Sequence, residues 1–250
     1  MIHKRLCMLL TWVTCFFTLS ATPLQAKEVL YAAAGVKLPL IELGESYEKK
    51  TGVKVSMNFD TAGAAEKKFL EDSNATLLIT TLERIQQNVA PHQQGEFIPL
   101  ADTVAGIAIS TPEKPKLINT DDLKKTLLQV KSLAFSDPAR GATVGKHFLK
   151  VIKSLDIEKE VMSKATLARD GVETMKLVQS KKVELGVTQI SEIMQADGSL
   201  LLGAFPDPYD LSTRYALWFK SGSETLKFSE FLRTKEAHEI YQKHGLRPYK

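Results

Sequence analysis

Cysteine is almost absent from this sequence, with two residues among 250, and both lie near the start. Cys7 and Cys15 fall in a leader with a basic start, an apolar run over 6–19 and a small residue, Ala26, at its end. These features are typical of a cleavable export signal. We therefore expect residues 1–26 to be a signal peptide. The exported chain is then expected to have no disulfide, thiolate metal site or cysteine nucleophile.

Several other features are missing after residue 26. The sequence contains no further apolar run of membrane-spanning length and no pair of histidines at metal-ligand spacing. The full sequence has 33 Lys and Arg, two of them in the leader, against 29 Asp and Glu, and the interspersed signs argue against a nucleic-acid partner. The Gly-x-Ser-x-Gly elbow and the phosphate loop are also missing. We therefore expect a soluble protein that is not an enzyme and has no cofactor and no metal.

Apolar strand patterns and amphipathic helix patterns alternate through most of the chain. This alternation predicts an α/β fold with mainly parallel sheets flanked by helices. Two turn-rich segments, 106–115 and 200–208, interrupt it, and we interpret both as crossings between two lobes with a cleft between them. The expected division is lobe 1 over 27–105, lobe 2 over 106–205, and a return to lobe 1 over 206–250 with two closing helices.

Three strand-to-helix junctions rich in small residues carry the functional prediction. Each would present unpaired helix N–H groups and the positive end of a helix dipole, and small residues let a ligand approach the backbone. Several such junctions at one cleft favour a small anion. With Gln189 after a buried strand, they give the candidate ligand-binding residues Ala34, Gly35, Val36, Thr61, Ala62, Gly63, Arg140, Gly141, Ala142 and Thr143.

Arg140 is the only charged side chain in this set, and a guanidinium suits a carboxylate or a tetrahedral oxyanion. We expect it to be the main charge partner of the ligand; the alternative is a solvated surface arginine. Thr61 could cap its helix as well as touch the ligand. Gly35 could serve only a tight turn, and Gln189 could be a buried, satisfied amide. Ser136 is a weaker candidate.

The order of these motifs resembles the periplasmic molybdate-binding protein family, as a divergent molybdate-like branch. The resemblance implies a two-lobe periplasmic protein that captures a small anion and delivers it to a membrane ABC permease; we expect a monomer. The segments that carry it extend through the exported chain and are Val29–Gly35, Asn58–Ala65, Leu77–Thr81, Phe135–Pro138, Gly186–Ile193, Phe228–Leu232 and His244–Leu246.

The sequence departs from that family where the ligand would bind. Gly35 stands where the family has a ligand-contacting serine, Thr61–Ala64 replaces a serine-rich junction, and the family's tyrosine has no match in Gly186–Gln189. These departures leave the ligand open between a molybdate-like oxyanion and a small carboxylate. A stand-alone periplasmic receptor that docks on a sensor or assembly partner is the alternative to transport.

Overall fold

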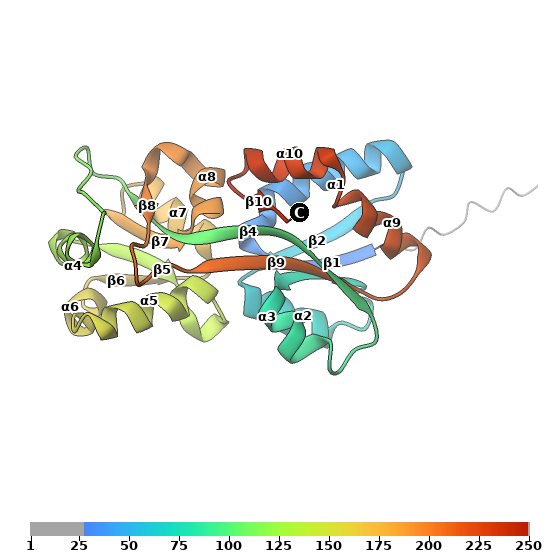
Figure 1. The fold of residues 1–250 in the computed structure, drawn as a ribbon, viewed down its shortest axis with the longest axis horizontal. Helices are drawn as coiled ribbons and strands as arrows, with labels where there is room; N and C mark the ends of the chain where they lie inside the picture. The colour runs from blue at the N-terminus through green and yellow to red at the C-terminus, as the bar shows by residue number, and fades with distance from the viewer. Residues whose placement is uncertain (1–27, 250) are drawn as a thin grey trace, which may run out of the picture.

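A computed structural model describes residues 28–249, without the side chains of Ser223 and Glu224. The expected signal peptide lies outside these residues. The described chain forms a ten-stranded sheet with strand order β2-β1-β3-β9-β4-β7-β5-β6, while β8 and β10 pair with β4. Helices flank the sheet on both sides, and the sheet runs through two halves of the molecule (Figure 1). The mixed α/β fold expected from the sequence is confirmed.

The first half combines the beginning and the end of the described chain. Its outer strands run in parallel, with β1 between β2 and β3. Its main hydrophobic core joins Leu30 of β1 to Tyr241 and Leu246 near the C-terminus. The elements of this half are β1 (Glu28–Ala33), α1 (Lys37–Thr51), β2 (Val55–Asp60), α2 (Ala62–Glu71), β3 (Leu77–Thr81), α3 (Leu82–Arg84), the π-helix η2 (Ile85–Val89), α9 (Ser223–Phe231), α10 (Lys235–Lys243) and β10 (Arg247–Pro248).

The second half has its own core, in which Phe135 of β5 packs edge to face on Phe148 of α5 at 4.9 Å between ring centroids. Its strand β5 pairs in parallel with both β6 and β7. The elements of this half are α4 (Thr120–Gln129), β5 (Leu133–Ser136), the 3-10 turn η3 (Pro138–Arg140), α5 (Thr143–Ser154), α6 (Glu158–Met162), β6 (Ala165–Ala168), α7 (Gly171–Gln179), β7 (Leu185–Gln189), α8 (Ile190–Asp197), the 3-10 turn η4 (Gly198–Leu200) and β8 (Leu201–Ala204).

Two long strands connect the halves, β4 (Glu96–Ile109) and β9 (Ser212–Phe219). From Glu96 to Val104, β4 pairs antiparallel with β9, and from Ala105 onward it pairs with β7. The sheet is therefore continuous across the molecule, and the two strands run side by side through its centre (Figure 1). Strands β4 and β9 pair antiparallel with each other and with their other neighbours. The parallel pairs, β1 with β2 and β3 and β5 with β6 and β7, lie toward the two edges of the sheet.

The second expected crossing is misplaced. Residues 200–205 do not pass between the halves: Leu201–Ala204 form β8, which pairs with β4 inside the second half, and Phe205 lies in the core of that half. The chain re-enters the first half along β9 instead. Helices α6 and α8 and strand β6 were not expected from the sequence. Strand β6 lies at the sheet edge with Leu167 exposed, so it lacks the apolar run by which buried strands are recognised. Within residues 28–249 no helix has the length and apolar character needed to cross a bilayer.

Candidate functional site

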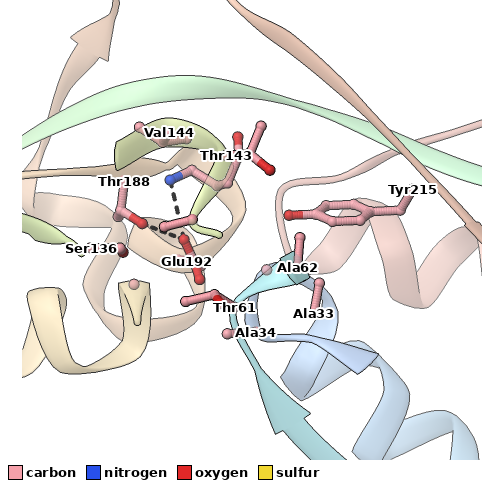
Figure 2. Close-up of a pocket in the computed structure, with 14 residues that line it drawn as sticks. Ala33, Ala34, Thr61, Ala62, Ser136, Thr143, Val144, Thr188, Glu192 and Tyr215 are labelled. Atoms are coloured by element: carbon pink, nitrogen blue, oxygen red, sulfur yellow. Dashed lines mark hydrogen bonds between the residues drawn. The ribbon is translucent and has the colours of Figure 1, made fainter. Parts of the chain in front are cut away.

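A small cavity lies where strand ends of the two halves meet (Figure 2). Its volume of about 30 Å³ is room for about two water molecules. We therefore expect a larger ligand to enter only if the halves move apart. None of the 14 described residues that line the cavity is Lys or Arg, and Glu192 is the one acid among them.

Five helix beginnings face this cavity. They belong to the 3-10 turn η1 (Ala34–Val36), which leads into α1, and to α2, α5, α7 and α8. Side chains already cap three of them: Thr61 accepts from the Ala64 N–H, Asp170 accepts from the Glu173 N–H, and Glu192 accepts from the Gln189 N–H at the start of α8. In contrast, the N-caps of η1 and α5 are alanines, which provide no side-chain cap. The first N–H groups of η1 and α5 are therefore the donors most open to an anion.

The structure brings together most of the residues that the sequence singled out. Among the lining residues are Ala34, Gly35, Thr61, Ala62, Ala142, Thr143 and Gln189, together with the weaker candidate Ser136. Val36 is buried in the core of the first half instead. Gly63, Arg140 and Gly141 border a separate groove beside the cavity.

Arg140 does not line the cavity, in contrast to its expected role as the charge partner of the ligand. Its Nη2 donates to both carboxylate oxygens of Asp60, at 2.9 and 3.0 Å, and its Nε donates to the Arg169 carbonyl. Its own carbonyl accepts a hydrogen bond from the Thr61 hydroxyl. Arg140 thus joins the second half to the first.

Asp60 is held as a carboxylate at this junction. Desolvation by burial raises the pKa of Asp60, but hydrogen bonds from Lys68, the Thr61 N–H and Arg140 outweigh it and lower the pKa below its usual value. Beside this ion pair the Gly63 N–H donates to the Gly141 carbonyl at 3.2 Å. A Cβ built on Gly63 would lie 2.7 Å from Gly141 Cα, so the absence of a side chain permits this close approach.

Glu192 is the main feature that the sequence analysis missed. It is the third residue of α8, it is 7 % exposed, and its carboxyl lies among the lining residues (Figure 2). The Thr188 hydroxyl and the Gln189 N–H both donate to Oε2. Burial, opposed by these two hydrogen bonds and assisted by the charge of nearby Asp170, raises the pKa of Glu192 to about 7.

Gly171 makes room for this carboxyl. A Cβ at Gly171 would lie 2.0 Å from Oε2 of Glu192 and 2.2 Å from Oγ1 of Thr188. The residue before it, Asp170, follows β6 and caps α7. Asp170-Gly171 is therefore another strand-to-helix junction of the kind seen in the sequence, overlooked because β6 itself was not recognised. The spacing of Gln189 and Glu192 is that of a capping box, which could have revealed both α8 and its buried acid.

Tyr215 contributes a hydroxyl from β9. This hydroxyl points toward the cavity (Figure 2) and lies 2.2 Å from where a Cβ of Gly35 would stand. A serine at position 35 would therefore collide with Tyr215, which gives a physical reason for glycine there. The remaining lining residues that the sequence did not indicate are Ala33, Val144 and Thr188. No group of three or more His, Cys, Asp or Glu in the described chain is arranged to hold a metal ion.

Two α/β halves around a small cavity are the arrangement of a protein that binds a small solute. Residues 29–247 match the family described as bacterial extracellular solute-binding protein, and the chain belongs to that family. An aconitate isomerase from a Pseudomonas species is 24 % identical over 92 % of this chain and 93 % of its own.

Two solved structures have the same fold. The periplasmic molybdate-binding protein of Azotobacter vinelandii superposes with a TM-score of 0.71 at 16 % identity, covering 90 % of this chain and all of its own. PEB3 with bound L-phospholactate superposes with a TM-score of 0.66 at 20 % identity, covering 89 % of this chain and 100 % of its own. The family and the molybdate-binding fold expected from the sequence are therefore confirmed.

Proposed function

We propose that the chain captures a small anion in the cavity between its halves. One observation carries this proposal: five helix beginnings face a single buried cavity, and those of η1 and α5 have no side-chain cap. Partly buried helix dipoles each contribute up to about 2 kcal/mol toward an anion. The fold relatives named for molybdate and L-phospholactate support the same ligand class.

We propose lobes of residues 28–105 with 212–249 and of residues 106–211, because Tyr209 and Leu211 pack on the core of the second half and β9 begins at Ser212. Capture would close them about β4 and β9, and the closed form would then deliver its ligand to an ABC permease in the periplasm. Docking on a sensor is the alternative. Uptake assays of the identified anion in a strain with and without the gene would separate them, because only transport predicts slower uptake after deletion.

A thermal-shift and calorimetry panel tests anion capture directly. The panel holds molybdate, tungstate, sulfate, phosphate and small mono- to tricarboxylates, each added to the chain without residues 1–26. A ligand present at a hundredfold excess over its Kd stabilises the folded state by about 2.7 kcal/mol. Saturable binding of at least one anion is expected. If no anion in the panel binds, the proposal is wrong.

Isomerisation of an unsaturated carboxylate is a second candidate function, favoured by Glu192. A buried carboxyl with a raised pKa inside a ligand cavity is suited to proton transfer. Its carboxylate would take a proton from one carbon of an allylic system, the double bond would shift, and the same proton would return to the far carbon. The Pseudomonas aconitate isomerase supports this candidate.

The test of the second candidate is incubation of cis-aconitate with the chain in D₂O. Interconversion of the two isomers, followed by proton NMR, together with its loss in Glu192→Gln, would support proton transfer. Unchanged cis-aconitate after prolonged incubation, in the presence of measurable anion binding, would leave capture as the function.

A further inference from the structure

We propose that the cavity selects anions that carry their own hydrogen-bond donor, such as hydrogen phosphate or a hydroxycarboxylate, through the acceptor oxygen of Glu192. This inference rests on the proposed capture of a small anion and names its ligand class. It excludes, at alkaline pH, fully deprotonated oxyanions such as molybdate and sulfate.

The cavity combines donors with a fixed acceptor. The N–H groups at η1 and α5 can receive the oxygens of an anion. Glu192 is different, because Thr188 and the Gln189 N–H both donate to its Oε2, and no described group donates to its Oε1. Because Gly171 has no side chain, the space beside it is free for this carboxyl. A ligand that enters therefore meets one carboxyl oxygen with no hydrogen-bond donor.

A second acceptor supports the same conclusion. Gln189 is 3 % exposed and also lines the cavity; its Nε2 donates to Thr213 at 2.9 Å, and its buried Oε1, which faces the Glu192 N–H in the capping box of α8, receives no hydrogen bond of normal geometry. Buried acceptors without donors are unfavourable by about 1–3 kcal/mol. A ligand hydroxyl removes that penalty at one such oxygen, whereas the oxygens of sulfate or molybdate add like-charge repulsion to it.

Among the residues that the structure describes, none supplies a cation near Glu192 to relieve this repulsion. The ionisable groups that act on its carboxyl are Asp170, ahead of α7, and Tyr215 on β9. The segments η1, η4, β7 and β8 contain no ionisable residue. On β4, Asp102 is paired with Arg214; on α7, Lys176 is exposed and Glu173 accepts from the Arg169 N–H. An anion without a proton therefore binds only when Glu192 takes one up.

This proton requirement makes the discrimination depend on pH. Burial holds the pKa of Glu192 near 7, so the carboxyl is mostly ionised at pH 8 and mostly protonated at pH 6. Sulfate and molybdate carry no proton at either pH, and their affinity should fall as Glu192 loses its proton, approaching tenfold per pH unit above 7. Hydrogen phosphate brings its own proton and should bind at pH 8.

The experiment measures Kd by calorimetry for phosphate, sulfate and molybdate at pH 6 and pH 8, with malate and succinate as a pair that differ in one hydroxyl. At pH 8 the wild-type chain should prefer phosphate over sulfate, and malate over succinate, by at least about tenfold. Glu192→Gln, whose amide can donate to an oxyanion, should lose both the preference and the pH dependence. Glu173→Gln, a nearby acid outside the cavity, should keep both.

The outcomes separate this inference from the proposed function. Sulfate or molybdate bound by the wild-type chain as tightly at pH 8 as at pH 6 would overturn donor selection and leave anion capture standing. An unchanged phosphate-to-sulfate ratio in Glu192→Gln would also overturn it. If none of the five anions binds the wild type at either pH, the inference is wrong; if the larger panel also shows no binding, the proposed capture is wrong as well.

Discussion

Arg140 and Asp60 form an ion pair across the two halves, with Nη2 of Arg140 within 3.0 Å of both carboxylate oxygens. The Asp60 side chain is 6 % exposed and that of Arg140 37 % exposed. Because the pair connects a strand end of the first half to η3 of the second, it holds the two halves together, and the guanidinium of Arg140 is paired with a carboxylate. This geometry predicts the behaviour of variants at both positions.

Asp60→Asn and Arg140→Ala should both weaken binding of the anion identified in the panel, because each removes the same contact of the closed form. If Arg140 instead contacted the ligand, Asp60→Asn would free its guanidinium and tighten binding. Calorimetry on both single variants and the double variant decides between these roles. The double variant should show non-additivity of about 0.5–3 kcal/mol.

Glu192 predicts a dependence of stability on pH. Because burial raises its pKa to about 7, the folded state binds more protons than the unfolded state between the ordinary value of 4.5 and 7. The contribution of Glu192 to the free energy of unfolding should therefore fall as pH rises through this range. Urea unfolding should show that the free energy of unfolding of Glu192→Gln, relative to that of the wild type, is higher at pH 8 than at pH 5. An identical pH profile for the two proteins would contradict this assignment.

Gly35→Ala should destabilise the fold by about 1–3 kcal/mol, the usual effect of overpacking. The new Cβ would lie 2.2 Å from the Tyr215 hydroxyl, on a side chain that is 3 % exposed and fixed in the core. Adding Tyr215→Phe removes the nearest atom and should recover part of the loss. Gly44→Ala, on the helix that follows, is the matched control.

The control differs in what its new methyl group would meet. At Gly44 the nearest atom is the terminal methyl of Met57, which can rotate away. Chemical denaturation of the three variants should therefore leave Gly44→Ala near the wild type. Equal losses at positions 35 and 44 would show that glycine is required for a reason other than Tyr215.

Gly63→Ala should weaken anion binding while the fold remains intact. Its Cβ would lie 2.7 Å from Gly141 Cα, and because this neighbour is backbone, the halves must separate to accommodate it. Small-angle scattering should show a larger radius of gyration for the variant, and calorimetry a weaker affinity. A variant as compact as the wild type, with the same affinity, would show that this close contact does not limit closure.

Local patterns in the sequence account for much of the site. The junctions at Gly35, Thr61 and Thr143 are readable because each joins an apolar run to small residues and then to a helix, all within a few positions. The sequence could not predict the partner of Arg140, because Asp60 lies 80 positions away and comes near only where the two halves meet. Tyr215 was missed for the same reason: no local pattern places its hydroxyl beside Gly35.

The interleaving of the two chain ends determines when this protein can fold. The core around Leu30 and Leu43 is completed by Phe228, Tyr241 and Leu246, so the N-terminal strands cannot bury their apolar faces until the last helices have been synthesised. Contacts so distant in sequence form slowly because the loop-closure entropy must be overcome first. We therefore expect the first core to be completed only after the whole chain has been synthesised.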